Sequence, residues 1–324
     1  MTIEERHDPS SIAALDGPPS ASRLTADAVA LHAPDTHLFR PDGAAGTCRA
    51  RCSLWWTDTP AYEDHAVGLV GHYAAADETA AQAVLARALE RLREAGCTLA
   101  LGPMDGATWF TYRFVTEGAD APPFFLEPHH PPAYPEHFVR AGFESLAEYV
   151  SAYVPEVDTE PPADPPLDVT VRPFNADAPT AELARLYGLV TDSFADNFLY
   201  TPIENERFVG LYRGLLDAVD PSLVRLAETP AGRLVGVAFL VPDRLQAARD
   251  EPVDTVIAKT LAVHPDVAGQ GLGSWLLHEA QWTARQQGYP HAIHALMHET
   301  NRSRRISRHY GDVVRRYTLF AREL

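Results

Sequence analysis

A glycine-rich turn between an apolar strand and an amphipathic helix carries the residue types that bind an anion. The apolar, β-branched run Thr255–Val263 predicts a buried strand, and Ser274–Gln287 has apolar residues at helical spacing. Between them, Gly269, Gly271 and Gly273 lack a Cβ, so the main chain can approach a ligand closely. Because the start of a helix presents free N–H groups and the positive end of its dipole, we expect the turn to hold a phosphorylated ligand.

The residues around the turn argue against two common nucleotide sites. No Gly-Lys-Ser/Thr follows the turn, so a P-loop for nucleoside triphosphates is not expected. A dinucleotide-binding fold places its glycine turn after the first strand of a repeating βαβ array, whereas only 51 residues follow Gly273. Two alternatives stay open: a nucleotide-binding module of another fold, and an ordinary connection that needs glycine for its geometry.

The stretch Leu261–Ser274 resembles the acyl-CoA pyrophosphate motif of the GNAT acetyltransferase superfamily. That motif reads Arg/Gln-x-x-Gly-x-Gly/Ala after a Leu-Ala-Val strand and a proline. Gly271 and Gly273 match it, and Gln270 sits where a second Arg or Gln is common. Ala268 replaces the usual first Arg/Gln, which removes a side chain near the phosphates but no backbone donor, so weaker binding is expected.

The resemblance implies acetyl-CoA as the acyl-donor cosubstrate. Main-chain groups before the turn would line the pantetheine arm in a splay between two strands, the turn amides would meet the pyrophosphate, and an Asn after the next strand would contact the arm. The residues placed there by the resemblance are Leu261, Ala262, Val263, Gly269, Gln270, Gly271, Leu272, Gly273, Ser274 and Asn301.

Acyl transfer to an amine also needs an acid for the leaving thiolate and a base for the amine. In the superfamily a Tyr about seven residues beyond the Asn often serves as the acid, but that position is Arg308 here. Tyr310 is the candidate acid; a tyrosine that only packs beside Gly311 is the alternative. No Glu stands in the strand before the turn, and Lys259 is a poor base unless it is desolvated, so no base is assigned.

An aromatic stretch in the N-terminal half, Gly102–Phe114, offers a second candidate for ligand contact. Its Asp-Gly turn is followed by Trp109, Tyr112, Arg113 and Phe114. These residues could line an acceptor pocket between the two halves. The alternative is that the aromatic rings fill the core of the N-terminal half.

Composition limits the classes of partner. The chain has 44 acidic and 27 basic residues and a net charge of −17, which disfavours nucleic acid and anionic membranes and favours a cationic acceptor, either a small-molecule amine or a peptide amine. No apolar stretch approaches the length of a membrane helix, and the N-terminus has no signal pattern. A homodimer is compatible with the sequence, which leaves the oligomeric state open.

Cysteine and histidine usage gives no metal or disulfide framework. The three cysteines, Cys48, Cys52 and Cys97, are too few for such a framework and indicate reduced thiols in a cytoplasmic protein. Histidines occur in pairs and near one another, but none shows ligand spacing typical of a metal site. No metal is therefore expected.

Two halves of the chain repeat one pattern. Strand, helix, glycine and strand occur at 68–75, 80–95, Gly96 and 98–101, and again at 255–263, 274–287, Gly288 and 291–296, with the two glycines 192 positions apart. The first copy joins strand to helix through Ala76-Asp-Glu-Thr79, whose carboxylates would repel phosphate. A duplication with a degenerate N-terminal copy is the interpretation; chance similarity of two α/β units is the alternative.

These observations predict an α/β (α+β) protein with two GNAT-like domains, each a mixed twisted sheet flanked by helices. The expected boundaries are a disordered leader at 1–25, a degenerate domain at 26–155, a proline-rich linker at 156–167 and an acetyl-CoA-binding domain at 168–324. The expected activity is N-acetyl transfer to a primary amine by direct attack. A non-catalytic acyl-CoA-binding or sensor protein is the alternative.

Overall fold

One mixed β-sheet runs through the whole molecule in this computed structural model, which describes residues 2–18, 21–43, 46–214 and 219–324. The first half of the chain provides β1 (Glu4–Arg6), α1 (Pro9–Ala13), α2 (Ala26–His32), β2 (Thr36–Pro41), β3 (Cys48–Trp55), β4 (Val67–Ala75), α3 (Glu78–Glu94), β5 (Leu99–Gly102), β6 (Phe114–Glu117), α4 (Tyr134–Arg140) and β7 (Glu144–Val154).

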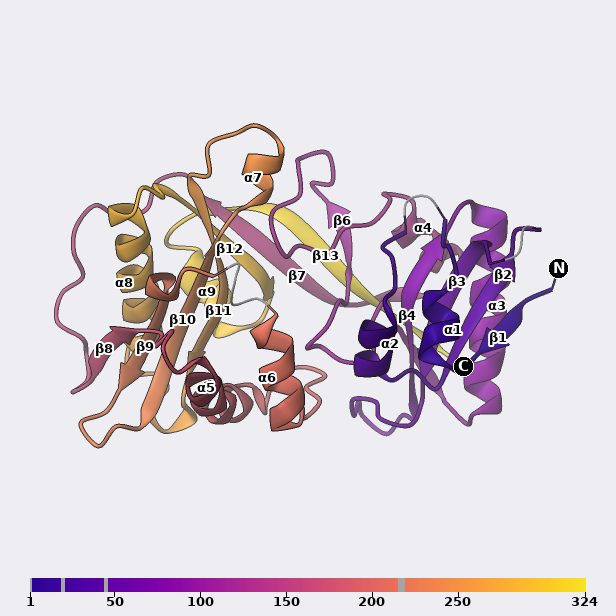
Figure 1. Cartoon of the computed structure of the whole chain (residues 1–324), viewed down its shortest axis with the longest axis horizontal. Coiled ribbons are helices and arrows are strands. Elements are labelled where there is room, and N and C mark those ends of the chain that lie inside the picture. The colour runs from indigo at the N-terminus through magenta and orange to yellow at the C-terminus, as the bar shows by residue number, and fades with distance from the viewer. Residues whose placement is uncertain (1, 19–20, 44–45, 215–218) are drawn as a thin grey trace.

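The second half provides β8 (Thr170–Pro173), α5 (Pro179–Phe194), α6 (Asn205–Arg213), η2 (Pro221–Leu223), β9 (Val224–Glu228), β10 (Leu234–Pro242), α7 (Leu245–Ala248), β11 (Thr255–Val263), η3 (Pro265–Val267), α8 (Leu272–Gln286), β12 (His291–His298), α9 (Arg302–Ser307) and β13 (Asp312–Glu323), where η marks a short 3-10 helix. The strand order is β1-β2-β3-β4-β5-β13-β7-β12-β11-β10-β9-β8, with β6 paired to β13 (Figure 1).

The repeat predicted from the sequence is present in the structure. In each half a strand, a long helix and a second strand form a crossover connection that leaves the two strands parallel: Val67 pairs with Leu99, and Thr255 pairs with His291. The glycines that end the two helices both have a left-handed backbone, with φ of +88° at Gly96 and +95° at Gly288. The mixed α/β fold class is confirmed.

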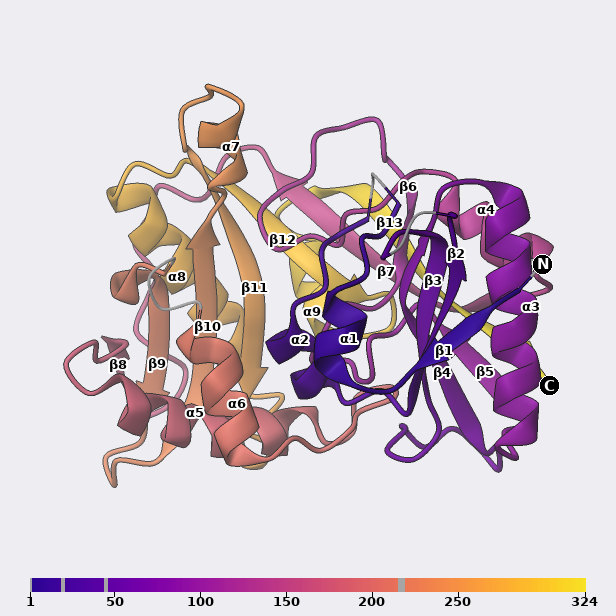
Figure 2. The same ribbon diagram turned by 45° about the vertical axis from the view of Figure 1, so that its right-hand side comes forward.

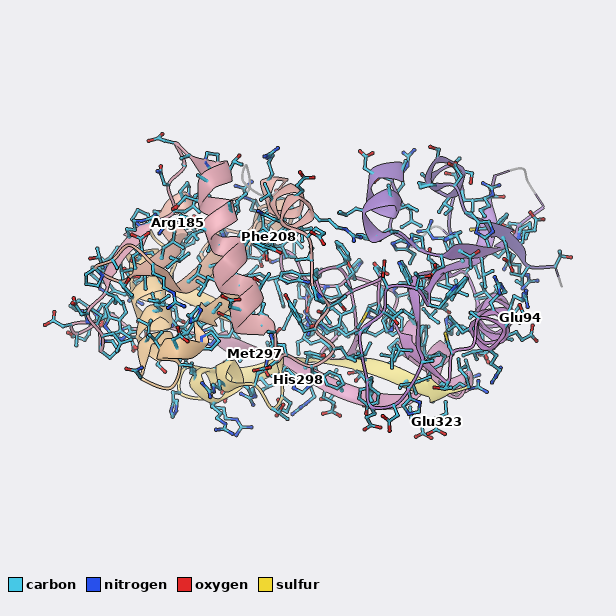
Figure 3. The ribbon with its side chains drawn as sticks, turned by 90° about the horizontal axis from the view of Figure 1, so that it is seen from below. Glu94, Arg185, Phe208, Met297, His298 and Glu323 are labelled. Carbon is cyan, nitrogen blue, oxygen red and sulfur yellow. The ribbon has the colours of Figure 1, made fainter. Side chains whose placement is uncertain are left out.

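The halves exchange their last strands, which the sequence did not predict. β7 leaves the first half and pairs with β12, while β13 leaves the second half and pairs with β5; β7 and β13 also pair with each other along most of their length. In Figure 3, Glu323 at the end of β13 accordingly lies on the side of the molecule that holds Glu94. The two expected sheets are thus joined into one thirteen-stranded sheet.

The segment expected to be a disordered leader contains regular structure where it is described. β1 pairs with β2 from Glu4↔Phe39 to Arg6↔His37, and Asp8 caps α1 by accepting a hydrogen bond from the Ser11 N–H at 2.8 Å. Ile12 is fully buried. The burial of Ile12 and the pairing of β1 with β2 therefore offset the conformational entropy that this segment loses when it becomes ordered.

Helices cover both faces of the sheet in the second half. α5 and α6 pack on one face with Val237, Ile257 and Ala262, while α8 packs on the other with Ala238 and Val256 (Figure 2). The alternation follows from the period of two along β10 and β11. Among the described residues, no helix has the length and apolar character needed to cross a lipid bilayer.

Candidate functional site

The glycine turn places an open helix start at the end of β11. Gly269 has φ +83°, and Gly271, the N-cap of α8, has φ +88°, a conformation that residues with a Cβ rarely adopt. A Cβ on Gly273 would lie 3.5 Å from Val263 Cγ2 and 3.7 Å from Ile306 Cδ1. The first turn of α8 therefore packs against the end of β11 and against α9.

The backbone N–H groups from Gly269 to Ser274 donate no hydrogen bond to another described residue. The first N–H groups of a helix have no intrahelical partner, and the N-cap here is a glycine without a side-chain acceptor. The proline-rich linker lies beside this helix, since Trp275 Nε1 donates to Ala163 O at 2.6 Å. The turn thus presents a row of free donors at the positive end of a fifteen-residue helix.

A gap opens between β11 and β12 directly before this turn. The two strands pair in parallel from Thr255↔His291 to Ala258↔His294, and no pairing continues beyond Ala258. β12 turns aside at Leu296, where φ is +59°. Lys259–Val263 of β11 is therefore unpaired on the β12 side, which leaves main-chain groups available to a ligand that lies in the gap.

Two residues from the N-terminal half fix the far wall of this gap. The Leu296 N–H donates to Ser151 Oγ at 3.0 Å, and Arg113 Nη1 donates to Leu296 O at 3.2 Å. The Arg113 guanidinium lies over the rings of Tyr112 and Tyr149, with its central carbon 3.9 and 4.1 Å from their centroids. Stacking on two aromatic rings holds the guanidinium in place, so the N-terminal half shapes the gap in the C-terminal half.

A β-bulge puts Lys259 at the mouth of the gap. Phe239 of β10 pairs with Thr260 and Leu240 pairs with Ala258, so Lys259 is an extra residue with no partner on β10. The Lys259 ammonium makes no hydrogen bond or ion pair with another described residue. Burial, together with the positive charge of Arg113, lowers the pKa of Lys259 to about 7, while the Glu127 carboxylate acts in the opposite direction.

Lys259 is the only lysine in the sequence, and the other 26 residues of the Lys and Arg types are all arginines. Arginine cannot lose its proton in a protein, whereas a buried lysine can. The sequence reasoning missed this contrast in residue usage: it named desolvation as the condition for Lys259 to act as a base but had no signal that the residue is buried.

The remaining predicted site residues, Asn301 and Tyr310, follow β12. Asn301 is the N-cap of α9, and its side chain makes no capping hydrogen bond. Tyr310 follows α9 and, like Leu261 and Val263, packs against the core on the α8 side of the sheet, with its ring 5.6 Å from that of His294. Burial raises the pKa of Tyr310, so the phenol keeps its proton at neutral pH.

The corresponding region of the N-terminal half is closed. Asp77 caps α3 by accepting from the Ala80 N–H at 2.8 Å and forms an ion pair with Arg49. Beyond the paired part of β4, the Met104 N–H donates to Val70 O at 2.9 Å, and Asp105 Oδ1 accepts from the His72 N–H at 2.6 Å. A carboxylate fills the anion position and main chain fills the gap, so this copy has no room for the same ligand.

The aromatic stretch of the N-terminal half packs into the cores of both halves. Phe114 packs in the core around α3, whereas Trp109 packs against the α5 and α6 core, with its Nε1 donating to Thr201 O at 2.7 Å. Phe124 also enters that second core. The N-terminal half therefore contributes side chains to the face of the sheet on which Lys259 opens.

A buried polar cluster in the N-terminal half was not anticipated. Among the described residues, His32, His72 and Asp105 form a group with ligand atoms within 4.8 Å of one another. His32 Nδ1 and His72 Nε2 lie 2.7 Å apart and share a hydrogen bond. Burial lowers the pKa of His32 to about 4 and that of His72 to about 3, so both rings are neutral.

Comparison with known proteins bears on these observations. Residues 221–311, which include the gap, the turn and α8, match the model of the acetyltransferase domain of the GNAT family. A protein of Caulobacter vibrioides named bacterial ceramide synthase is 28% identical over 192 residues, which are 56% of this chain and 50% of the relative. The chain thus spans half the length of this curated relative.

Solved structures share the whole fold. A GCN5-related N-acetyltransferase from Sphaerobacter thermophilus superposes with a TM-score of 0.51 at 16% identity, over 99% of this chain and 95% of that one. A tandem GNAT protein from the clavulanic acid biosynthesis pathway gives 0.52 at 13% identity, over 99% and 98%. A probable N-acyltransferase from Enterococcus faecalis gives 0.58 at 11% identity, over 99% and 72%. At these identities the likeness establishes the fold.

Proposed function

We propose that this chain, whose C-terminal half contains a GNAT acetyltransferase domain, transfers an acyl group from a coenzyme A thioester to an amine. The observation that carries the proposal is the row of free N–H groups from Gly269 to Ser274 beside the gap between β11 and β12. A diphosphate is an anion that suits a helix start. The gap is open to main-chain contact by an extended arm.

The proposed contacts follow the order of the groups along the CoA molecule, from the pyrophosphate to the thioester. The amides of Gly269, Gln270, Gly271, Leu272, Gly273 and Ser274 bind the pyrophosphate, and the main chain of Leu261, Ala262 and Val263 binds the pantetheine arm, which Asn301 contacts from α9. These contacts direct the thioester toward the bulge at Lys259. Tyr310 is the proposed proton donor to the thiolate.

An amine acceptor suits the charge of the protein. The net charge of −17 attracts cations, and screening at physiological salt confines that field to about 8 Å, so the local donors still hold an anionic donor molecule. One relative is named a ceramide synthase, and a ceramide is an amide of a fatty acid. That name supports amide formation. Acetyl-CoA, the donor expected from the sequence, is the shortest thioester covered by this proposal, and a cytoplasmic location is part of it.

A transfer assay tests this function. The protein is incubated with acetyl-CoA or a longer acyl-CoA and a panel of primary amines that includes amino acids, polyamines and long-chain amino alcohols. Release of free thiol together with an amide product in the mass spectrum is the expected result. Tight calorimetric binding of CoA with no thiol release for any donor and amine would instead favour the non-catalytic acyl-CoA-binding protein. An absence of CoA binding would exclude both.

A further inference from the structure

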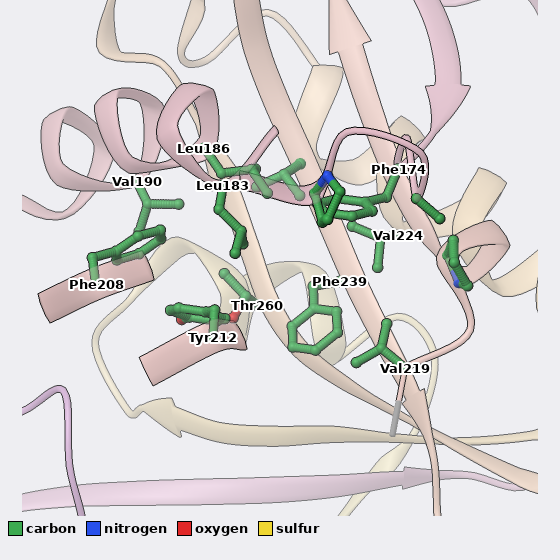
Figure 4. A pocket seen from close by; sticks show the side chains of 14 residues that line it. Phe174, Leu183, Leu186, Val190, Phe208, Tyr212, Val219, Val224, Phe239 and Thr260 are labelled. Atoms are coloured by element: carbon green, nitrogen blue, oxygen red, sulfur yellow. The ribbon is translucent and has the colours of Figure 1, made fainter. Parts of the chain in front are cut away.

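An apolar cavity lies beside the bulge, between the α5–α6 pair and the sheet. Its volume is ≈ 150 Å³. Leu183, Leu186 and Val190 of α5 line one side and Phe239 of β10 another, and the wall continues to Thr260 of β11 (Figure 4). None of its lining residues is charged.

The size and lining of the cavity define the chemistry of its occupant. An apolar cavity of about 150 Å³ can hold a molecule the size of benzene, so this one accommodates about six carbons. Apart from the hydroxyl groups of Thr260 and Tyr212, the lining side chains are apolar, and none carries a charge that would offset a buried phosphate or ammonium group. The occupant is therefore an aliphatic segment.

The position of Thr260 connects the cavity to the proposed reaction centre. Thr260 follows Lys259 directly and pairs with Phe239, and both Thr260 and Phe239 line the cavity. A thioester carbonyl at the bulge would lie one residue away from this wall. Main-chain contacts along β11 direct the acyl end of the donor, not the acceptor, to this point.

We propose that the cavity binds the aliphatic chain of the acyl group, so that the donor is an acyl-CoA longer than acetyl-CoA. This inference rests on the proposed function, because it assumes that the thioester lies in the gap. Each methylene that enters the cavity tightens binding by at most about fourfold. Affinity therefore rises from acetyl-CoA to hexanoyl-CoA and then levels off as the cavity fills.

Calorimetry with CoA, acetyl-CoA, hexanoyl-CoA and decanoyl-CoA tests the proposal on the full chain. Hexanoyl-CoA is expected to bind at least tenfold more tightly than acetyl-CoA. Val190→Phe fills the cavity and should remove that gain, whereas Phe239→Ala enlarges it and should extend the gain to decanoyl-CoA. Val139→Phe makes the same change as Val190→Phe on the exposed surface of α4 and should leave the series unchanged.

The outcomes separate this proposal from the proposed function. Failure of CoA itself to bind the wild-type protein would refute the function, while CoA binding also shows that each variant is folded. If CoA binds but the three acyl-CoAs differ by less than twofold, the acyl-chain assignment is wrong. The same holds if chain length matters only in the amine, because the cavity would then serve the acceptor.

A separate observation concerns Lys259, the single lysine in a chain with 26 arginines. It is half-buried, stands at a bulge that gives it no partner on β10, and opens on the face that receives side chains from both halves. The charged groups that face it are Arg113 and Glu127 of the N-terminal half, and Glu127 is held by Arg315 at 3.0 Å.

We infer that Lys259 is the general base of the transfer. The neutral Lys259 amine takes one proton from the acceptor ammonium, and the freed nitrogen attacks the thioester carbonyl carbon. Collapse of the tetrahedral intermediate breaks the C–S bond, and the thiolate receives the second nitrogen proton, directly or through Tyr310. Lys259 then returns its proton to solvent, so the products are an amide and the thiol of CoA.

The uniqueness of Lys259 makes its protonation directly measurable. Reductive methylation with ¹³C-formaldehyde labels one lysine and the α-amino group, and NMR should show the lysine signal titrating near pH 7, consistent with the lowered pKa of about 7. Because the base must be neutral, kcat/KM should rise with pH and level off above this midpoint. A midpoint near 10.5 would overturn the inference.

Two substitutions distinguish a base from a fixed positive charge. Lys259→Met and Lys259→Arg should both lower kcat/KM by about 100-fold or more at pH 7.5, because arginine keeps the charge but cannot accept a proton. CoA affinity should stay within twofold of wild type, which confirms folding. Retention of more than half the activity by Lys259→Arg would show that only the charge matters and would refute the role as base.

Discussion

Asp77 and Gly271 hold the same place in the two halves of the chain, as the residues that cap helices α3 and α8. Asp77 accepts a hydrogen bond from Ala80 and pairs with Arg49, so α3 carries its own negative charge at its N-terminus. Gly271 brings no side chain, and α8 begins with its donors free. The duplicated fold thus has this helix in both halves, but the first N–H groups of the helix are left without a side-chain cap only in the second half.

A carboxylate at Gly271 should give α8 the same negatively charged N-terminus that Asp77 gives α3. Gly271→Asp introduces a negative charge that competes with the pyrophosphate for the same amides, and φ of +88° adds backbone strain. We expect CoA affinity to fall by about tenfold or more, measured by calorimetry.

Gly232→Asp is the matched control for this substitution. Gly232 has φ +77° in the turn between β9 and β10, and a Cβ there would contact nothing within 4 Å. The control carries the same charge and comparable strain, so it should lower the unfolding temperature without changing CoA affinity. Equal loss of affinity in both variants would show that the turn at Gly271 is not the phosphate site.

Local patterns in the sequence predicted the elements that position this site. The strand expected at Thr255–Val263 has those bounds in the structure, and the helix expected at Ser274–Gln287 spans Leu272–Gln286. Apolar periodicity and glycine at the helix ends are local signals, and both act within one turn or one strand. They are sufficient to locate the helix start and its donors.

Pairing between distant strands was beyond those local signals. The last strand, β13, spans Asp312–Glu323 and pairs with β5 of the other half. An alternating pattern identifies a strand and its buried face but not the partner strand. The exchange of β7 and β13 therefore had no counterpart in the sequence reasoning.

The environment of Lys259 depends on the same long-range arrangement. Its burial and the neighbouring charges of Arg113 and Glu127 come from segments more than 130 residues earlier in the chain. The strand before the glycine turn, Thr255–Val263, contains no carboxylate, so the sequence reasoning assigned no base. The structure supplies a candidate at a bulge, where an extra residue interrupts the ladder.

Replacing Tyr310 by phenylalanine tests its role as the acid. The phenol is half-buried near the gap, and burial raises its pKa. Tyr310→Phe should lower kcat by about tenfold, since a thiolate is a good leaving group and water can replace part of the acid's role. CoA affinity should be unchanged. Tyr289→Phe, which removes a hydroxyl just before β12, serves as the control. Equal kcat in both variants would mean that solvent, not Tyr310, protonates the thiolate.

Acid should destabilise the fold through the buried His294. Its Nε2–H donates to Gln281 Oε1 and its Nδ1 accepts from Ser307 Oγ, each at 2.9 Å, so both ring nitrogens are satisfied in the neutral form. Burial lowers its pKa from 6.5 to about 4. The unfolded chain binds the proton first, so the free energy of unfolding decreases as pH falls from 6.5 toward 4, by on the order of 3 kcal/mol for this group.

Urea unfolding at pH 7.5 and pH 5 measures this contribution. His294→Gln, which cannot ionise, should lose less stability between the two pH values than the wild-type protein, even though it is less stable at pH 7.5. His309→Gln changes an exposed histidine and should follow the wild-type dependence. His32 and His72 also have lowered pKa values, so part of the acid sensitivity persists in His294→Gln. Parallel losses in His294→Gln and wild type would mean that the ring is already charged in the folded protein.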